Sequence, residues 1–329
     1  MTGLRWGVLG LGVIANSFTT DLIANGMKVA AVASRSKEKA ANFAASHGVG
    51  AAYGSYEELA QATGVDAIYI ATPHPFHAEA AALAIKGGKH VLIEKPITLN
   101  GQEAASIRAL GKVHEVVVME AMWTRFLPHM VRIREILAEG LLGEIKAVCA
   151  SYTKVTTDDP AHRINNLELG GGALLDLGVY PISLIHQVLG TPTTIMATGR
   201  FRKTGVDAEV SAHFRYENGA SALMITASDV SGPNTASILG TEGFIEIDGV
   251  WCAPTAFTMF DRKRVVMEEF ARAEINGRGM HYQALELERL VAAGENSSAV
   301  MPIGESVATM ETMDAIRAQI GLAYPTDPN

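Results

Sequence analysis

Cysteine is scarce in this chain. The two cysteines, Cys149 and Cys252, lie in apolar, strand-like stretches without CxxC or His/Cys spacing. They cannot build a metal site between them, and one chance disulfide would not make a framework. The sequence therefore predicts neither a metal site nor a disulfide-stabilised fold.

Clustered basic residues and long apolar runs are also lacking. The formal net charge is −8, and nucleic acid and anionic membranes both need clustered Lys and Arg, so neither is an expected partner. The N-terminal M-T-G-L-R-W-G has no apolar signal region, and we identify no apolar stretch long enough to cross a bilayer. We expect a soluble protein of a reducing cytoplasm.

The 329 residues, 48% of them hydrophobic, exceed what one compact core usually holds, so two domains are expected. Up to about residue 121, apolar runs of strand length alternate with Ala-rich helical stretches. Because these strands show no polar alternation, they predict a parallel sheet covered by helices, a doubly wound α/β domain over residues 1–122. The expected strands are Trp6–Leu9, Lys28–Ala33, Ala67–Thr72, Val91–Glu94 and Val116–Glu120, with helices at 37–46, 76–86 and 101–112.

After Trp123 the pattern predicts an α+β domain over residues 123–329, with an open, mostly antiparallel sheet. The dipeptide in E217-N-G-A220 predicts a two-residue type I′ hairpin. The expected strands are Ile145–Lys154, Thr194–Lys203, Ala208–Tyr216, Ala220–Ser228, Ser237–Ile247 and Phe257–Phe270, with helices at 172–189, 281–293 and 305–321.

The first strand runs into G10-L-G12-V-I-A15, which matches G-x-G-x-x-G/A. The first glycine permits a tight turn, the second lets the backbone approach a pyrophosphate, and the helix from Val13 points its N–H groups at the phosphates. Because this motif follows a strand and opens a helix, it predicts a dinucleotide-binding turn. The alternative is an ordinary glycine turn.

About twenty residues after this motif, NAD-binding domains usually carry an acidic residue for the ribose 2′-hydroxyl. This chain has A33-S34-R35-S36-K37-E38-K39 instead. Ser34, Arg35 and Lys39 could bind a 2′-phosphate, for which Arg supplies planar, charge-assisted donors. We therefore predict NADP(H), with NAD(H) and an ordinary basic loop as alternatives.

Polar groups follow the next two expected strands. The run T72-P-H-P-F-H77 places Thr72 and His74 at the carboxyl edge of the sheet, where ligands bind in doubly wound folds, whereas His77 could be structural. Lys95 should emerge at the same edge, and Pro96 restricts it to extended conformations. These positions suggest contacts to a coenzyme, although a solvated strand end would also explain Lys95.

The second half of a site should come from L169-G-G-G-A-L-L-D-L-G-V-Y-P-I-S183. Asp176 and Tyr180 are four residues apart and so share one face of a helix, which Pro181 should kink. A phenol with an acid one turn before it suits a proton donor. A buried structural Tyr–Asp pair is the alternative.

Together the glycine motif, Glu94-Lys95-Pro96, the segment M-E-A-M-W-T-R-F-L-P from Met119 and G-G-G-A-L-L-D-L-G-V-Y-P from Gly170 resemble the Gfo/Idh/MocA oxidoreductase family, over essentially the whole chain. They are most similar to its branch of dimeric dihydrodiol dehydrogenases and NADP-dependent D-xylose dehydrogenases. The resemblance implies a Rossmann domain, a second domain with an open sheet, and a homodimer or higher oligomer formed through that sheet.

The resemblance also implies roles for particular residues. Lys95 and Tyr180 would be catalytic, with Asp176 orienting the pair, and the substrate would contact His74, Lys95, Trp123 and Tyr180. Coenzyme contacts would come from Gly10, Gly12, Val13, Ile14, Ser34, Arg35, Lys39, Thr72, His74, Glu94, Lys95, Trp123 and Arg163.

The implied reaction is hydride transfer between NADP(H) and a hydroxyl or carbonyl carbon of a small sugar, polyol or vicinal diol. Tyr180 would exchange the hydroxyl proton while Lys95 stabilises the developing charge. A glycosidase with tightly held NAD⁺, a non-catalytic cofactor-binding sensor and a reductase of a keto sugar remain alternatives. The substrate and the direction of the reaction are not readable from the sequence.

Overall fold

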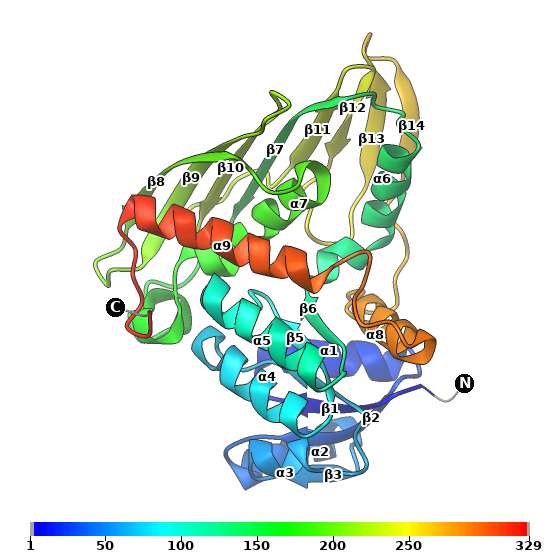
Figure 1. Cartoon of the computed structure of the whole chain (residues 1–329), viewed down its shortest axis with the longest axis vertical. Helices are drawn as coiled ribbons and strands as arrows, with labels where there is room; N and C mark the ends of the chain where they lie inside the picture. Colours follow the sequence, from blue (N-terminus) through cyan, green and yellow to red (C-terminus); the bar gives the residue numbers. More distant parts are fainter. Residues whose placement is uncertain (1–2, 328–329) are drawn as a thin grey trace. The chain divides into compact units, whose positions relative to one another are not determined.

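The computed structural model describes residues 3–327, which form two compact units. The first contains the chain up to Trp123 together with Ile275–Val307, and the second contains Thr124–Glu274 and the chain from Ala308 onward. Both units combine helices with a sheet (Figure 1).

The first unit has a six-stranded, all-parallel sheet in the order β3-β2-β1-β4-β5-β6. This is the Rossmann order, whose ligand crevice opens where the chain direction switches between β1 and β4. The predicted α/β fold is therefore confirmed. Its strands are β1 (Arg5–Leu9), β2 (Lys28–Ala33), β3 (Ala51–Tyr53), β4 (Ala67–Ile70), β5 (His90–Glu94) and β6 (Val118–Ala121).

Helices cover this sheet as the Ala-rich stretches predict. They are α1 (Val13–Ala24), α2 (Lys37–His47), α3 (Tyr56–Ala60), α4 (His77–Lys86), α5 (Gly101–Val113) and α8 (His281–Ala293). Two short elements, β3 and α3, were not predicted. The strands expected to be third and fourth are consequently the fourth and fifth in chain order.

Residues 275–307 pack with the first unit, whereas the predicted second domain runs from 123 to 329 without a break. Residues 275–307 pack with the first unit because helix α1 binds them. The buried carboxylate of Asp21 accepts hydrogen bonds from the backbone N–H groups of Arg278 and Met280, at 2.9 Å each through Oδ2. The indole N–H of Trp6 donates to Glu288 on α8 at 2.9 Å.

The second unit has an eight-stranded sheet in the order β14-β13-β12-β11-β7-β10-β9-β8. Only β7 and β10 pair in parallel, so the sheet is mostly antiparallel, as predicted. Its strands are β7 (Ile145–Thr153), β8 (Thr194–Phe201), β9 (Asp207–Arg215), β10 (Ser221–Ala227), β11 (Ala236–Gly240), β12 (Gly243–Ile247), β13 (Phe257–Asp261) and β14 (Val266–Phe270).

Three local predictions for this sheet were wrong. The runs 237–247 and 257–270 are not single strands, because the chain reverses inside each and forms β11–β12 and β13–β14. The Asn-Gly turn is not type I′, since Gly219 takes a positive φ of 79° while Asn218 does not. Instead Gly219 donates its N–H to the carbonyl of Tyr216, and Tyr216 pairs with Ala220, which gives a three-residue loop.

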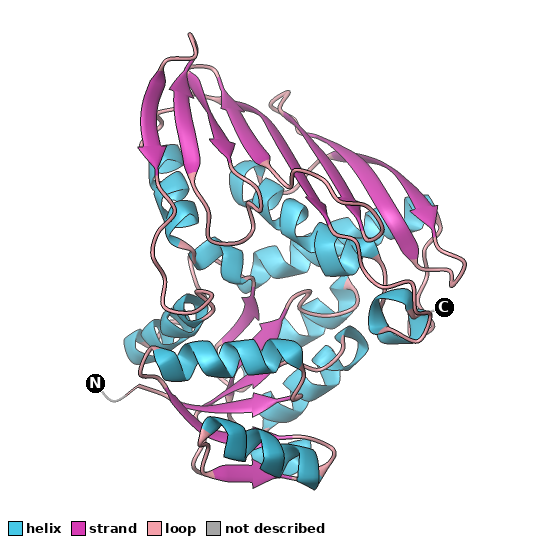
Figure 2. Cartoon of the chain, turned by 180° about the vertical axis from the view of Figure 1, so that it is seen from behind, coloured by secondary structure: helices cyan, strands magenta, loops and turns pink. Residues whose placement is uncertain are grey.

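Helices α6 (Pro128–Ala138) and α7 (Val179–Leu189) belong to the second unit, and α9 (Ile303–Ile320) ends there. Figure 2 shows the strands of the large sheet in front of these helices, so one face of the sheet carries no helix. That face has large exposed hydrophobic side chains, including Leu223 and Ile225 on β10.

One helical stretch, Leu167–Leu189, is long and apolar enough to cross a membrane by length and composition. The expectation that no such stretch exists was therefore wrong. However, 78% of its apolar window is buried, which is typical of the core helix of a folded domain.

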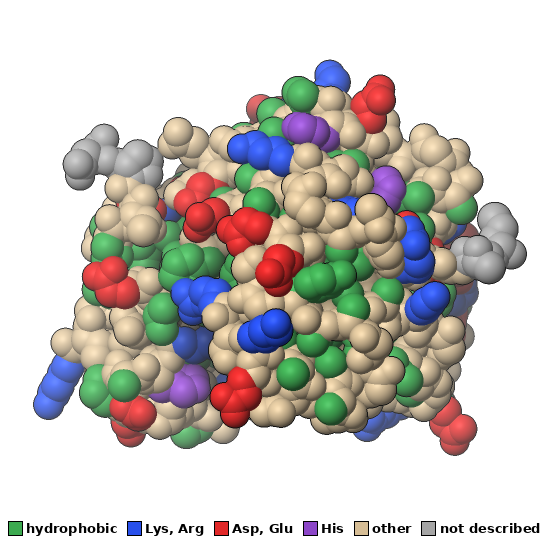
Figure 3. Space-filling view, turned by 90° about the horizontal axis from the view of Figure 1, so that it is seen from below, with side chains coloured by type: hydrophobic (Ala, Val, Ile, Leu, Met, Phe, Trp, Pro, Cys, Tyr) green, Lys and Arg blue, Asp and Glu red, His purple; other side chains and the backbone are tan. Residues whose placement is uncertain are grey.

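Charged side chains of both signs are interspersed on the face shown in Figure 3, where Lys and Arg lie among Asp and Glu. This view agrees with the absence of a clustered basic run in the sequence.

Candidate active site

The glycine turn after β1 is built for close backbone approach. Gly10 has φ +87°, and a Cβ there would lie 2.7 Å from the carbonyl carbon of Ala71 on the neighbouring strand end. Gly12 is the N-cap of α1, and a Cβ there would meet none of the described atoms within 4 Å. The turn is therefore tight on the protein side and open on the other, as a pyrophosphate site requires.

Strand register brings the polar strand ends into one row. Leu9 pairs with Ile70, and Ile70 pairs with Ile93. The residues that follow consequently share the carboxyl edge of the sheet. They are Gly10 after β1, Ala71 and Thr72 after β4, and Glu94 at the end of β5 with Lys95 after it. Val13 at the start of α1 is 87% exposed, and Ile14 is half-buried.

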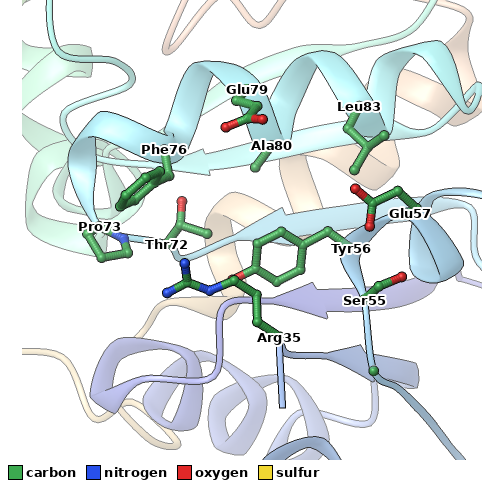
Figure 4. A pocket seen from close by; sticks show the side chains of 11 residues that line it. Arg35, Ser55, Tyr56, Glu57, Thr72, Pro73, Phe76, Glu79, Ala80 and Leu83 are labelled. Carbon is green, nitrogen blue, oxygen red and sulfur yellow. The ribbon is translucent and has the colours of Figure 1, made fainter. Parts of the chain in front are cut away.

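A cavity of about 420 Å³ opens at this edge within the first unit (Figure 4). Arg35 contributes the only Lys or Arg side chain among its lining residues, and the Thr72 hydroxyl is a buried polar group without a hydrogen-bond partner among residues 3–327. A cationic donor and an unsatisfied hydroxyl in one cavity fit the adenosine end of a dinucleotide. The lining residues are Arg35, Gly54, Ser55, Tyr56, Glu57, Thr72, Pro73, Phe76, Glu79, Ala80 and Leu83.

Ser34 and Lys39, predicted with Arg35, do not line this cavity. Ser34 is buried, and its hydroxyl accepts the N–H of Ser36 at 3.3 Å. Lys39 lies on the exposed first turn of α2, whose N-cap is Ser36. Their predicted contacts to a coenzyme stay predictions.

The two histidines after β4 differ in their surroundings. His74 is buried in a short 3₁₀ turn, with its ring 5.7 Å from that of His77. His77 is fully buried, with Nε2 2.8 Å from the carbonyl oxygen of Thr72 and Nδ1 2.9 Å from that of Pro96, and the nitrogen that carries the hydrogen donates to its carbonyl. Burial lowers the pKa of His77. Through these two contacts, the His77 ring connects the residues that follow β4 with those that follow β5.

The Lys95 loop is anchored by buried carboxylates. Glu94 accepts hydrogen bonds from the phenol of Tyr69 and, at 3.2 Å, from the backbone N–H of Lys95. Glu120 accepts the N–H of Ile97 at 3.1 Å, and the Lys95–Pro96 peptide bond is cis. Glu94, predicted as a coenzyme contact, thus has a structural role in holding this loop, and Lys95 is half-buried beyond it.

Trp123 is buried at the end of the first unit, in the short turn that follows β6. The guanidinium of Arg278 lies over its ring, 5.6 Å from the ring centre. This contact is a cation–π interaction, and no sequence pattern pointed to Arg278.

In the second unit, Asp176 lies in a π-helical segment, Leu174–Gly178, directly before α7. Such segments often occur at functional sites. Asp176 is buried and accepts a hydrogen bond from Arg163 at 3.0 Å. Tyr180 follows in the first turn of α7, and its ring meets that of Tyr152 edge to face at 5.3 Å.

The two glycines at 171 and 172 are required by close neighbours, a backbone carbonyl and a buried carboxylate. A Cβ on Gly172, where φ is +117°, would lie 1.9 Å from Oδ1 of Asp207, and one on Gly171 would lie 2.6 Å from the carbonyl oxygen of Arg163. Asp207, at the start of β9, accepts the N–H of Leu174 at 2.6 Å. Tyr324 donates its phenolic hydrogen to the carbonyl of Gly171 at 2.7 Å.

Burial raises the pKa of Asp207 from 3.8 to about 6, against the opposing effect of its backbone hydrogen bonds. Asp207 binds the first residues of the segment that carries Asp176 and Tyr180, yet it lies on a strand more than 25 positions further along the chain. Sequence reasoning therefore missed it. Tyr56, Phe76 and Tyr152 were missed in the same way. Residues 3–327 contain no group of three or more His, Cys, Asp or Glu that could hold a metal ion.

Two family models match the chain. Residues 4–122 match the oxidoreductase family with an NAD-binding Rossmann fold, and residues 130–246 match the GFO/IDH/MocA C-terminal domain. Full-length relatives agree. The mouse trans-1,2-dihydrobenzene-1,2-diol dehydrogenase is 35% identical, with 98% of this chain and 99% of the relative covered. The chain belongs to the Gfo/Idh/MocA oxidoreductase family.

Further similarities are consistent with this membership. The human trans-1,2-dihydrobenzene-1,2-diol dehydrogenase is 34% identical over 98% of this chain and 99% of its own. A 3-ketoreductase from Actinomadura kijaniata, solved with NADP and TDP-benzene, has a TM-score of 0.84 and 26% identity, covering 97% of this chain and 98% of that one. An aldose-aldose oxidoreductase from Caulobacter crescentus shares the fold, with a TM-score of 0.86, 21% identity and coverage of 96% and 97%.

Asp207→Asn should change how stability depends on pH. The folded chain holds the Asp207 proton more tightly than the unfolded chain, so between about pH 4 and 6 the wild type loses stability as pH rises. The rise of the Asp207 pKa from 3.8 to about 6 corresponds to roughly 3 kcal/mol of unfolding free energy. We expect the free energy of unfolding of the variant minus that of the wild type to increase by up to this amount from pH 4 to pH 7.

Urea unfolding at several pH values checks this. The same measurement on Asp158→Asn is the control for removing a carboxylate that is not buried, since this side chain is 93% exposed and pairs with Arg202 at the surface. A difference for Asp207→Asn that is flat or that falls with rising pH would contradict the account.

Proposed function

We propose that this oxidoreductase transfers a hydride between NADP(H) and the carbinol or carbonyl carbon of a small vicinal diol, sugar or polyol. One observation carries the proposal: strand register places the glycine turn, the Arg35 cavity and the Lys95 loop at a single sheet edge. The names of the relatives, a dihydrobenzene-diol dehydrogenase and a 3-ketoreductase, support this class.

When bound, the nicotinamide coenzyme supplies the hydride acceptor or donor. The open turn at Gly12 and the N-terminus of α1, with Val13 and Ile14, would hold its pyrophosphate. Arg35 would pair with the 2′-phosphate, and Thr72 would use its unsatisfied hydroxyl. The NADP found with the 3-ketoreductase supports the choice of coenzyme.

In the proposed oxidation, Tyr180 would act as the phenolate, and its oxygen would take the O–H proton of the substrate as the substrate gives up its hydride; Tyr180 would then be the neutral phenol. Lys95 stabilises the negative charge on the substrate oxygen. Reduction of a carbonyl runs the same steps backward. His74 and Trp123 would contact the substrate.

Asp176 would act by orienting the helix turn before Tyr180. Its hydrogen bond to Arg163 links it to the loop at 155–168, which would shape the substrate pocket. The edge of Tyr152 restricts the Tyr180 ring from one side. A positioned phenol suits general acid–base catalysis better than a rotating one.

Tyr180→Phe and Lys95→Ala should each lower kcat by about 10²- to 10⁴-fold, because each removes a group that acts on the reacting oxygen. The dissociation constant of NADPH should change less than about 3-fold, since its phosphates are bound elsewhere. Absorbance at the nicotinamide band, with diols, aldoses and keto sugars as substrates, gives turnover, and fluorescence titration gives binding.

Two matched controls separate these roles from general damage. Tyr216→Phe removes another buried phenol of the second unit, and Lys86→Ala removes an exposed lysine of α4. Both should keep near wild-type turnover. If Tyr180→Phe or Lys95→Ala also keeps it, the role assigned to that residue is incorrect.

We also propose that the chain forms a homodimer through the helix-free face of the large sheet, and that it acts in the cytoplasm. Leu223 and Ile225 are 52% and 43% exposed there, and Met196 on β8 is 52% exposed. Register places Leu223 and Met196 on either side of His213, so their side chains share one face. Burying such a face against a second copy removes apolar surface from water.

Leu223→Glu combined with Ile225→Glu should convert the dimer to a monomer, because charges would be buried at its centre. Sedimentation velocity measures the mass. Val113→Glu, at a valine of α5 in the first unit that is 76% exposed, should leave the mass unchanged. A monomeric wild type, or a double variant that stays dimeric, would contradict the proposed interface.

A further inference from the structure

The Arg35 guanidinium is the cationic group of the cavity in the first unit, and it is approached from two sides. Phe76, in the short turn after β4, lies on one side of it, with the guanidinium carbon 5.8 Å from the ring centre. Tyr56, the first residue of α3, approaches from another side, and Figure 4 shows its phenolic oxygen next to the Arg35 side chain.

The contact between Tyr56 and Arg35 is polar. Figure 4 shows the Tyr56 oxygen beside the guanidinium. Burial raises the pKa of Tyr56, and the positive charge of Arg35 acts in the opposite direction. Because a guanidinium only donates hydrogen bonds, the phenolic oxygen faces it as an acceptor. The phenol therefore borders the guanidinium on one side, and the Phe76 ring lies against it on another.

Local structure keeps the phenol in place. Ser55 is the N-cap of α3 and accepts the backbone N–H of Glu58 at 3.1 Å. Glu58 in turn accepts the N–H of Gly54 at 2.9 Å, which closes the turn between β3 and α3. Helix α3 packs on α4, whose residues Ala80 and Leu83 line the same cavity. Tyr56 thus stands on a capped helix turn and not on a loose loop.

Among the residues that line the cavity, Arg35 carries the one positively charged side chain. Glu57 and Glu79 are the other ionisable side chains of the lining besides Tyr56, and both are carboxylates that repel a phosphate. Arg35 is the one cationic side chain of this lining that can pair with a 2′-phosphate. An arginine that is ordered before binding loses less side-chain entropy on binding than a freely rotating one.

We propose that Tyr56 is a specificity-determining residue that positions the Arg35 guanidinium for the 2′-phosphate of NADP(H). The inference rests on the proposed use of NADP(H) and adds the residue that makes the preference strong. Tyr56 acts through Arg35, so it favours the phosphorylated coenzyme and leaves contacts to the unphosphorylated one unchanged.

Binding of NADPH and NADH, measured by fluorescence titration, tests this without relying on turnover. Tyr56→Phe should weaken NADPH binding by about 5- to 20-fold, because the Arg35 side chain then loses more entropy when it binds the phosphate, and NADH binding by less than about 2-fold. In an Arg35→Ala background, adding Tyr56→Phe should change NADPH binding by less than about 2-fold. The matched control is Tyr53→Phe, at a tyrosine of β3 that does not line the cavity.

The outcomes separate this inference from the function it rests on. Equal weakening of NADPH and NADH binding by Tyr56→Phe, or an equal effect with and without Arg35, would overturn the positioning role while the NADP preference of the wild type stood. A wild type that binds NADH as tightly as NADPH would overturn both the coenzyme preference and the inference. Turnover is assayed separately, so loss of activity alone cannot be mistaken for either result.

Discussion

The parallel register of β1, β4 and β5 is the constraint on which the first half of the site depends. Since Leu9, Ile70 and Ile93 lie side by side, the three loops that follow them must emerge at one edge. The sheet then needs no further device to bring a glycine turn, a polar cavity and a lysine together. Buried groups fix the details, with His77 joining two of the strand ends and Glu94 holding the backbone of Lys95.

In the second unit, a buried carboxylate positions the segment that carries Asp176 and Tyr180. Asp207 binds the first backbone N–H groups of the segment that carries Asp176 and Tyr180, at a place where the glycines leave room for it. The helix start is therefore tied to the sheet, and the phenol follows at a fixed distance along the helix. The raised pKa of Asp207 indicates that this arrangement costs stability, which is common at functional sites.

Local signals made much of this readable from the sequence. Gly10 and Gly12 follow an apolar strand, and Lys95 stands at a strand end before proline, so their edge follows from the rules of doubly wound sheets. The prediction of one strand over Ser237–Ile247 was wrong, although Gly240 and Gly243 on either side of Thr241-Glu242 mark the turn inside it. The Asn-Gly signal gave the right hairpin with the wrong turn.

Contacts between distant segments could not be predicted from one sequence. Tyr56 meets Arg35 because β3 lies next to β2, yet β3 has only three residues and no clear pattern. Asp207 lies against Gly172 only in the folded sheet, and the strand order of that sheet cannot be read from short stretches of sequence. Ser34 and Lys39 were chosen for charge and position alone, and the cavity lies against Arg35 without them.

The central claim is that an amine and a phenol act on one substrate oxygen beside the coenzyme. A crystal structure of the ternary complex with NADP⁺ and an unreactive diol analogue tests it most directly. The account predicts that the Lys95 nitrogen and the Tyr180 oxygen both lie within hydrogen-bonding distance, about 3 Å, of the same hydroxyl. A complex in which the diol binds with either group turned away from that hydroxyl would contradict it.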